Sequence, residues 1–294
     1  MVSQSMNRAV ELFSRQPWTK PLDSTLANLV SRAFSAAGPA GLKAKDFLNG
    51  TWLGHPLHPV LTDVPTGAWT VACLLDAMDT LAGRSEFQAG ADTAILVGTI
   101  GAVGSALTGL ADWQYLVGRP RREGLLHGLM NLSAVGLFAT SYGLRRSGAR
   151  GAGQAASILG YSVATAAAYL GGTLVYADHS GVDHAPTEDM PTKFTPVIDD
   201  VDLPEGKLTA VEAKGTPVLL YRTGDRLYAI ANTCTHLGGP LNEGELADGS
   251  VICPWHGSRF ALSDGHIING PATFPQPCFE TRVRQGKIEV RLAP

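Results

Sequence analysis

The stretches Cys234-Thr-His236-Leu-Gly-Gly and Cys253-Pro-Trp-His256-Gly-Ser258 hold two cysteines and two histidines in two similar pairs. Each pair lies in a segment containing glycine or proline, as is typical of a loop, and sixteen residues separate His236 from Cys253. Thiolates are soft ligands that favour iron–sulfur centres, and imidazoles that replace two of them leave the second iron less electron-rich. The mixed set therefore indicates a metal site, and a 2Fe-2S cluster fits it.

The pattern C-x-H followed by C-x-x-H resembles that of the Rieske iron–sulfur family, and the flanking residues agree with the family pattern. The agreement extends to Thr235, Leu237, Gly238, Pro254, Gly257 and Ser258. The resemblance implies that Cys234 and Cys253 bind one iron and that His236 and His256 bind the other. It also implies a small antiparallel, barrel-like β fold with a cluster subdomain inserted at residues 232–262.

A structural zinc site is the alternative, because two cysteines and two histidines also satisfy tetrahedral zinc. Zinc fingers usually space their ligands as Cys-x-x-Cys and His-x-x-x-His on a hairpin and a helix, which differs from the spacing found here. The spacing therefore favours the iron–sulfur centre. A zinc-stabilised interaction module anchored to the membrane stays as the non-redox alternative.

Four positions near the pairs predict how such a centre is tuned. Many Rieske proteins of the cytochrome bc type join the two cluster loops by a disulfide, whose positions correspond to Gly239 and Trp255 here. Their sulfurs accept hydrogen bonds from a serine and a tyrosine, which correspond to Ser258 and to Phe260, a residue without a hydroxyl. Because such bonds stabilise the reduced state, we expect a potential in the lower or middle part of the roughly −150 to +300 mV Rieske range.

Charge and cysteine content narrow the class of protein. The chain of 294 residues has a net charge of −3 and only 17% charged residues, so it indicates no nucleic-acid partner. Two of the four cysteines belong to the paired motif. Cys73 and Cys278 are expected to be small buried residues, so the cysteines predict no disulfide framework.

Four long apolar stretches each approach the roughly 20 residues that a helix needs to cross a bilayer. They are Val60 to Met78, Thr93 to Ala111, Leu125 to Leu144 and Ala155 to Ala177. Small residues recur four positions apart in the second and fourth, as in helices that pack closely in lipid. We therefore predict an all-α bundle of four transmembrane helices. Residues 45–180 also resemble a family of small bacterial membrane domains (DUF2231-like), which implies no particular chemistry.

The predicted chain has four parts: an N-terminal segment (1–50), the four-helix domain (51–178), a linker (179–193) and an all-β Rieske domain (194–294). In the first part, apolar residues at helical spacing predict an amphipathic helix from Pro21 to Phe34, capped by Asp23 or Ser24. It lies on the membrane surface or packs on the protein.

Eight β-rich segments separated by turn residues follow the linker: Thr195 to Asp199, Lys207 to Glu212, Pro217 to Arg222, Leu227 to Ala231, Val251 to Cys253, Arg259 to Leu262, Thr281 to Arg284 and Lys287 to Arg291.

Four spans place both ends of the chain on one side of the membrane. Six basic residues lie near the membrane on that side: Lys43, Lys45, Arg119, Arg121, Arg122 and Lys193. Four lie in the opposite loops: Arg84, Arg145, Arg146 and Arg150. This excess, and the lack of an apolar segment of signal-peptide type in residues 1–50, predict a bacterial membrane protein with its Rieske domain in the cytoplasm.

Five histidines outside the motif fall on the predicted membrane face that carries the Rieske domain: His55, His58, His127, His179 and His184. Interfacial ionisable residues tend to be functional, because their desolvation is costly. Two such imidazoles would bind a haem b as axial ligands, or accept protons from a quinol. The structural alternative is that they cap helices and bond across loops. The candidate haem or quinone site consists of His55, His58, His127 and His179.

These features predict a membrane-anchored electron carrier. It would pass single electrons between a redox partner protein, such as an oxygenase, dehydrogenase or hydrogenase, and a membrane acceptor, either quinone or haem. The alternative is a subunit of a quinol-oxidising or haem-binding oxidoreductase. A catalytic oxygenase subunit needs a further iron held by two histidines and a carboxylate downstream of the cluster, whereas only His266 follows His256.

Overall fold

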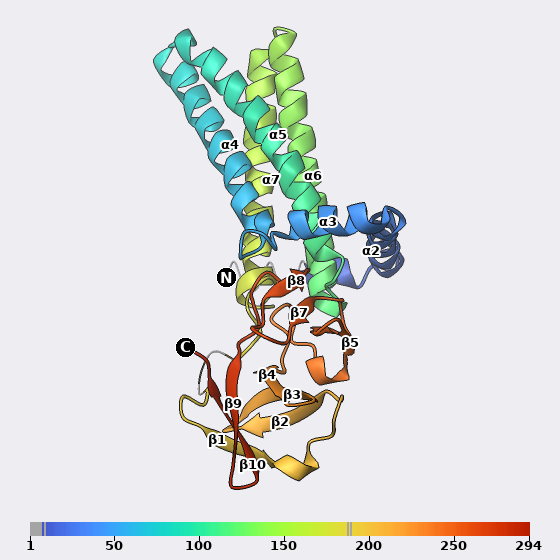
Figure 1. The fold of residues 1–294 in the computed structure, drawn as a ribbon. Helices are drawn as coiled ribbons and strands as arrows, with labels where there is room; N and C mark the ends of the chain where they lie inside the picture. The colour runs from blue at the N-terminus through green and yellow to red at the C-terminus, as the bar shows by residue number, and fades with distance from the viewer. Residues whose placement is uncertain (1–7, 9, 187, 189) are drawn as a thin grey trace. The chain divides into compact units, whose positions relative to one another are not determined.

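Four long helices form two antiparallel hairpins in the computed structural model, which describes residues 8, 10–186, 188 and 190–294 (Figure 1). One hairpin consists of α4 (Leu57–Ala82) and α5 (Gln88–Trp113), and the other of α6 (Gly118–Arg146) and α7 (Arg150–Tyr176). Packing is more extensive within each hairpin than between the hairpins. All four apolar stretches of the sequence are therefore helical, as predicted.

Length and composition support a membrane location for two of these helices. Among the residues that the structure describes, Ser85–Trp113 and Arg150–Tyr176 are long and apolar enough to cross a bilayer. The other two helices carry more charge: α4 contains Asp63, Asp76 and Asp79, and α6 begins and ends with arginines. Four membrane spans therefore stay a prediction.

The N-terminal amphipathic helix is present as α2 (Thr19–Ala36), and it packs against the bundle. The contact forms a small apolar core of Ala27, Trp113 and Leu125. The predicted cap is wrong, because Asp23 and Ser24 both lie inside the helix and Ser24 Oγ donates to the carbonyl of Lys20 (3.0 Å). Pro21 is compatible with this earlier start, since proline fits the first turn of a helix.

The two hairpins are related by an internal repeat. Interior residues of α4 meet residues of α6 that lie 69 positions later in the chain: His58 with His127, Trp69 with Phe138, and Asp76 with Arg145. The rings of Trp69 and Phe138 stack with their centroids 4.1 Å apart. The same layers therefore follow one another along both helices.

The second helices of the hairpins repeat as well, through glycines that make room for these side chains. A Cβ atom at Gly98 would lie 2.5 Å from the Trp69 ring, and one at Gly160, the equivalent position of α7, would lie 3.1 Å from the Phe138 ring. Each aromatic residue therefore requires a glycine on the neighbouring helix of its own hairpin.

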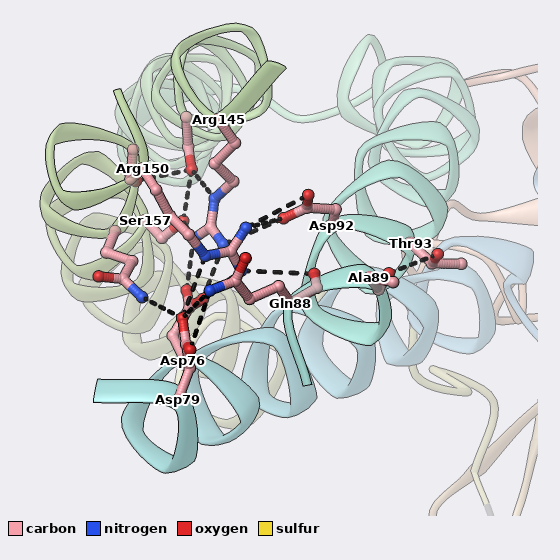
Figure 2. A network of polar contacts seen from close by, with 12 residues as sticks. Asp76, Asp79, Gln88, Ala89, Asp92, Thr93, Arg145, Arg150 and Ser157 are labelled. Carbon is pink, nitrogen blue, oxygen red and sulfur yellow. Dashed lines mark hydrogen bonds and ion pairs between the residues drawn. The ribbon is translucent and has the colours of Figure 1, made fainter. Parts of the chain in front are cut away.

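A buried ion-pair network joins all four helices near the two hairpin turns (Figure 2). The guanidinium of Arg145 is fully buried and binds the carboxylate of Asp76 with two nitrogens, and it lies 3.2 Å from Asp92. Arg150 reaches Asp79 and Asp92, each at 3.1 Å. Two serine hydroxyls accept further hydrogen bonds from Arg145: Ser141 (3.0 Å) and Ser157 (3.1 Å). Asp76 and Asp79 of α4 and Arg145 of α6 are thus paired inside the protein.

Three small antiparallel sheets form the second unit, which comprises Gly181–Pro294 together with Pro39–Pro56. In spatial order, the first sheet contains β1 (Thr195–Asp199), β10 (Lys287–Leu292) and β9 (Phe279–Arg284). The second contains β2 (Thr209–Ala213), β3 (Thr216–Thr223) and β4 (Arg226–Ala231). The third contains β5 (Glu245–Ala247), β6 (Ser250–Ile252), β7 (Arg259–Ala261) and β8 (Ile267–Asn269). The all-β class is as predicted, although β5 and β8 are additional strands.

Two apolar cores lie on opposite sides of β3, because successive residues of a strand face opposite ways. Val218 and Leu220 belong to the core with Ile288 and the first sheet. Leu219 belongs to the other core, which contains both motif cysteines and the fully buried Phe260. The central sheet therefore supports the candidate metal centre on one of its faces.

An additional helix, α3 (Gly38–Asn49), belongs to this β unit and has no counterpart in the sequence-based prediction. The carboxylate of Asp46 accepts hydrogen bonds from the backbone N–H of Gly270 (3.0 Å) and from the side chain of Asn269 (3.2 Å). Thr51 donates to the carbonyl of Ala272 (3.4 Å). The segment before the hairpins thus holds a loop of the β unit.

Candidate metal centre

The two motif loops have the same backbone hydrogen bonds. In the first, the N–H of Cys234 donates to Gly239 (2.8 Å), and the N–H of Gly238 donates back to Cys234 (2.9 Å). The second loop repeats both bonds at 2.8 and 3.1 Å: Cys253 to Ser258, and Gly257 to Cys253. Gly238 and Gly257 have φ values of +78° and +77°, which favour glycine. Each Cys–His pair is therefore presented by an equivalent tight turn.

The four motif side chains divide into a buried pair and a more exposed pair. Cys234 and Cys253 are 2% and 3% exposed, whereas His236 and His256 are only half-buried. The imidazole rings lie 5.0 Å apart between centroids and are perpendicular. The sulfurs therefore lie in the core and the imidazoles toward the surface of the unit.

Hydrogen bonds prepare the two sulfurs to act as ligands. Backbone N–H groups of His236 and Leu237 donate to Cys234, and those of Trp255 and His256 donate to Cys253. The hydrogen bond between the two thiols lowers the pKa of Cys253 to about 6 and raises the pKa of Cys234. One thiolate is therefore available near neutral pH, and the thiolate is the form that binds metal.

The surroundings of His236 favour its neutral form, which is the form that binds metal. Burial, and then the nearby His256, His184 and Lys45, lower the pKa of His236 to about 3. Lys45 comes from α3, and the backbone N–H of His184 donates to the carbonyl of Thr235 (3.0 Å). Neither neighbour was apparent from the motif, because both precede the β strands in the chain.

A third segment, residues 272–277, fixes the first motif loop through side chains outside the motif. The amide of Gln276, only 2% exposed, donates to the carbonyls of Ala231 (2.8 Å) and Thr233 (2.5 Å). Its oxygen accepts from the N–H of Thr235 (3.3 Å), whose hydroxyl donates to the carbonyl of Phe274 (2.8 Å). Gln276 thus replaces backbone partners that the irregular loop lacks.

The positions that correspond to the missing disulfide face each other. A Cβ atom at Gly239 would lie 3.1 Å from the Trp255 ring and 2.9 Å from the sulfur of Cys253. Glycine is therefore required where the two loops meet. The Trp255 ring also lies beside that of His256, with centroids 6.4 Å apart.

The two predicted tuning positions are both buried next to the cysteines. The hydroxyl oxygen of Ser258 accepts a hydrogen bond from the N–H of Ala272 (2.9 Å), which leaves its own proton free to be donated. Phe260 is fully buried in the core that contains Cys234 and Cys253. Its ring offers packing where a tyrosine would offer a hydroxyl.

The donor set fits a two-metal centre better than a single ion. A tetrahedral zinc site needs all ligand atoms within roughly 2.0–2.3 Å of one point. Among the described residues, no group of three or more His, Cys, Asp or Glu side chains converges in a way that would hold one metal ion. Two adjacent sulfurs on one side and two imidazoles on the other instead suit a cluster whose two irons are bound separately.

The structure brings only some of the other candidate histidines together. The rings of His58 and His127 lie within the hairpin bundle with centroids 6.3 Å apart. His55 belongs to the β unit, is exposed, and has Nδ1 3.1 Å from the Pro56 carbonyl oxygen. His179 is exposed after α7 and has a positive φ of 54°.

A small antiparallel β unit with two equivalent Cys–His loops defines an iron–sulfur class of domain. Comparison with known families agrees, because residues 193–280 match the Rieske [2Fe-2S] domain. The chain therefore belongs to the Rieske family, and this membership implies a 2Fe-2S cluster. Residues 54–184 match a second family described as a predicted membrane protein (DUF2231).

Several curated relatives resemble the Rieske part. Ferredoxin CarAc of Metapseudomonas resinovorans is 41% identical over 91 residues, which are 30% of this chain and 84% of the relative. The 3-phenylpropionate/cinnamic acid dioxygenase ferredoxin subunit of Escherichia coli is 33% identical over 31% of this chain and 86% of its own length. The cytochrome b6-f complex iron-sulfur subunit of Chlorobaculum tepidum is 34% identical, and this chain spans half its length.

Among solved structures, the ferredoxin of carbazole 1,9a-dioxygenase from Nocardioides aromaticivorans is 29% identical. The match covers 34% of this chain and 97% of the ferredoxin chain, with a TM-score of 0.32. The curated relatives named above are ferredoxins and an iron-sulfur subunit.

Proposed function

We propose that this protein is a membrane-anchored Rieske electron carrier. Cys234 and Cys253 are the proposed ligands of one iron, and His236 and His256 are the proposed ligands of the other. The observation that carries the proposal is the separation of buried, hydrogen-bonded sulfurs from partly exposed imidazoles on two equivalent loops. When bound, a cluster of this kind takes up and releases one electron.

The protein residues supply position and electrostatics. Backbone N–H groups, and the hydroxyl of Ser258, would stabilise added negative charge on the sulfurs and so raise the reduction potential. The partly exposed His236 and His256 form the edge through which an electron would reach a partner. With Phe260 in place of a hydroxyl donor, we expect a potential below the top of the Rieske range.

The proposed redox partner protein is an oxygenase or another soluble redox enzyme. Support comes from the ferredoxin relatives, which include a dioxygenase ferredoxin subunit. The second partner is proposed to be a membrane acceptor, either quinone or haem, since the same chain contains the membrane-protein family domain. The relation to a cytochrome b6-f subunit favours the same kind of acceptor.

The helical unit is proposed to anchor the carrier by four spans, with the Rieske domain in the cytoplasm of a bacterial cell. Two of the four opposing basic residues, Arg145 and Arg150, are paired with aspartates inside the bundle. The exposed basic residues on the side opposite the chain ends are then only Arg84 and Arg146. By the same criterion three exposed basic residues remain on the side of the chain ends, Lys43, Arg119 and Lys193, so the excess that favours cytoplasmic chain ends keeps its direction.

Paramagnetic resonance of the purified, dithionite-reduced full chain tests the proposed centre. We expect a Rieske-type 2Fe-2S signal with two irons and two acid-labile sulfides per chain. His236→Cys and His256→Cys should each alter or abolish this signal, whereas His266→Cys in an exposed turn should leave it unchanged. One zinc per chain without sulfide would overturn the proposal.

A further inference from the structure

The pair His58 and His127 occupies equivalent positions of the two hairpins. Nδ1 of His58 lies 2.8 Å from the carbonyl oxygen of Ser105, and Nδ1 of His127 lies 2.8 Å from that of Ala167. The two carbonyls are themselves equivalent, being 62 positions apart on α5 and α7, as are Gly98 and Gly160. The repeat therefore brings two imidazoles with equivalent backbone hydrogen bonds to the junction of the hairpins.

These hydrogen bonds determine the tautomer of both rings. A carbonyl oxygen only accepts, so Nδ1 must carry a proton in each case, and in the neutral ring Nε2 then presents a lone pair. Metal-bound histidines use this arrangement, in which the second ring nitrogen donates to a backbone carbonyl. Two such rings cannot hydrogen-bond to each other through Nε2, because neither Nε2 has a proton to donate.

The spacing of the rings suits one metal atom between them. Two metal–nitrogen bonds of about 2 Å each, added to the distance from each nitrogen to its ring centre, place the ring centres roughly 6 Å apart. The observed centroid distance is 6.3 Å. The ring planes are nearly perpendicular, at 88°, which allows each ring to keep its own carbonyl partner.

Glycines allow both rings to lie against the neighbouring helix. A Cβ atom at Gly109 would lie 2.8 Å from Cε1 of His58, and one at Gly171 would lie 3.0 Å from Cε1 of His127. Gly109 and Gly171 are again 62 positions apart. The side of each ring that bears Nδ1 and Cε1 is thus fixed against its own hairpin.

The number of side-chain ligands favours one kind of metal group. Among the described residues, no third His, Cys, Asp or Glu side chain completes a metal site with these two. A bare ion would therefore lack ligands, whereas an iron porphyrin brings four equatorial nitrogens and needs only two axial ones. We propose that His58 and His127 are the two axial ligands of a haem bound within the helical unit.

A quinone fits the pair less well. Quinone carbonyls accept hydrogen bonds, and a neutral ring with its proton on Nδ1 has none to donate from Nε2; a quinol hydroxyl could donate to that nitrogen, so quinone or quinol binding is an outcome that the test below must separate. The amide nitrogen of Asn131 lies 3.2 Å from Nε2 and 3.4 Å from Nδ1 of His127. Being almost equidistant from both, it lies beside the ring rather than along the Nε2 lone pair, and it donates to the His127 carbonyl (3.0 Å).

Optical spectroscopy of the full chain in detergent tests this site, after expression with ample haem supply or addition of haemin. We expect about one haem per chain, with the reduced and oxidised spectra of a low-spin, six-coordinate haem. His58→Ala and His127→Ala should each lose the low-spin spectrum and most of the bound haem. His55→Ala, three residues upstream on the exposed loop, should keep both.

A second variant keeps both imidazoles and separates ligation from folding. Gly109→Ala would press on the His58 ring, so we expect a shift of the haem spectrum or reduced occupancy while the helical content by circular dichroism stays the same. Absence of haem in the wild-type chain under both conditions would overturn the proposal. So would a low-spin spectrum that survives in His58→Ala and His127→Ala, or binding of a quinone without haem.

Use of this haem as the membrane acceptor rests on the proposed function, but its binding does not. Cys234→Ser should therefore abolish the Rieske signal and leave the haem spectrum intact. His58→Ala should do the reverse. Because each variant should lose only the signal of its own site, the two variants test the haem site and the Rieske centre separately.

Discussion

The hydroxyl of Ser258 is the side chain on which the tuning of the proposed cluster most depends. It is fully buried, and its oxygen already accepts the N–H of Ala272, so its proton remains for sulfur. We expect Ser258→Ala to lower the midpoint potential by tens of millivolts, since a tenfold change in a one-electron equilibrium corresponds to about 59 mV. Potentiometric titration should show no such shift for Ser263→Ala in the exposed turn. An unchanged potential in Ser258→Ala would show that the hydroxyl does not bond to the cluster.

Gln276 should determine how firmly the first motif loop is held. Gln276→Met keeps the size of the side chain but leaves the carbonyls of Ala231 and Thr233 without this donor. A buried polar group without a partner costs about 1–3 kcal/mol, so the visible absorbance should be lost at a lower temperature. Lys207→Met, on the exposed surface of the same unit, serves as the control. Equal melting of both variants would contradict this role for Gln276.

The motif residues were predictable because each Cys–His pair is local in the chain, whereas the residues that hold the loops of the site lie far away in the sequence. Gln276 bonds to Thr235 across 41 positions, and Asp46 bonds to Gly270 across 224. No spacing rule links such residues, since only the folded sheets bring them together. The candidate residues Cys234, His236, Cys253, His256 and Ser258 could therefore be named from the sequence, whereas the third loop and α3 could not.

The pairing of helices in the bundle depends on Arg145, whose charge has no access to solvent. Arg145→Met leaves the buried Asp76 with only the more distant Arg150 at 3.5 Å. Breaking a buried pair in this way lowers the free energy of unfolding by about 3–5 kcal/mol. Thermal loss of helical circular dichroism in detergent should reveal this, and Arg146→Met, one residue later and exposed, should melt like the wild type. The double variant Asp76→Asn with Arg145→Met should be less damaged than Arg145→Met alone.

Helix existence was predictable from apolar length, but the internal repeat was not. The small-residue ladders Ala94-Gly98-Ala102 and Gly160-Ala164-Ala168 contain its signal, as does the recurrence of Leu57-His58 as Leu126-His127. The paired residues are chemically unlike, as with Trp69 and Phe138 or Asp76 and Arg145, because they must complement each other rather than match. Similarity between the halves is therefore weak, and contact between them was needed to reveal the equivalence.

The number of membrane spans is a property of the whole chain. It can be determined from the sides of the membrane on which two exposed residues lie. Arg84 lies between α4 and α5, and Lys193 lies after α7. If all four helices cross the bilayer, three crossings separate these residues and they lie on opposite sides. If only α5 and α7 cross, two crossings separate them and they lie on the same side. The difference follows from counting helices and requires no knowledge of how the two units are arranged.

Labelling with a membrane-impermeant maleimide measures this directly. We expect the Lys193→Cys variant to react in inside-out vesicles and the Arg84→Cys variant to react in intact spheroplasts, each adding one label to the number found for the wild type. The wild-type chain is the control for its four natural cysteines, all free and none fully exposed. Labelling of both variants from the same side would leave two spans, in agreement with the two helices that composition alone supports. Opposite labelling with the sides reversed would keep four spans and move the Rieske domain out of the cytoplasm, because the positive charges that orient the chain would then have been assigned to the wrong face.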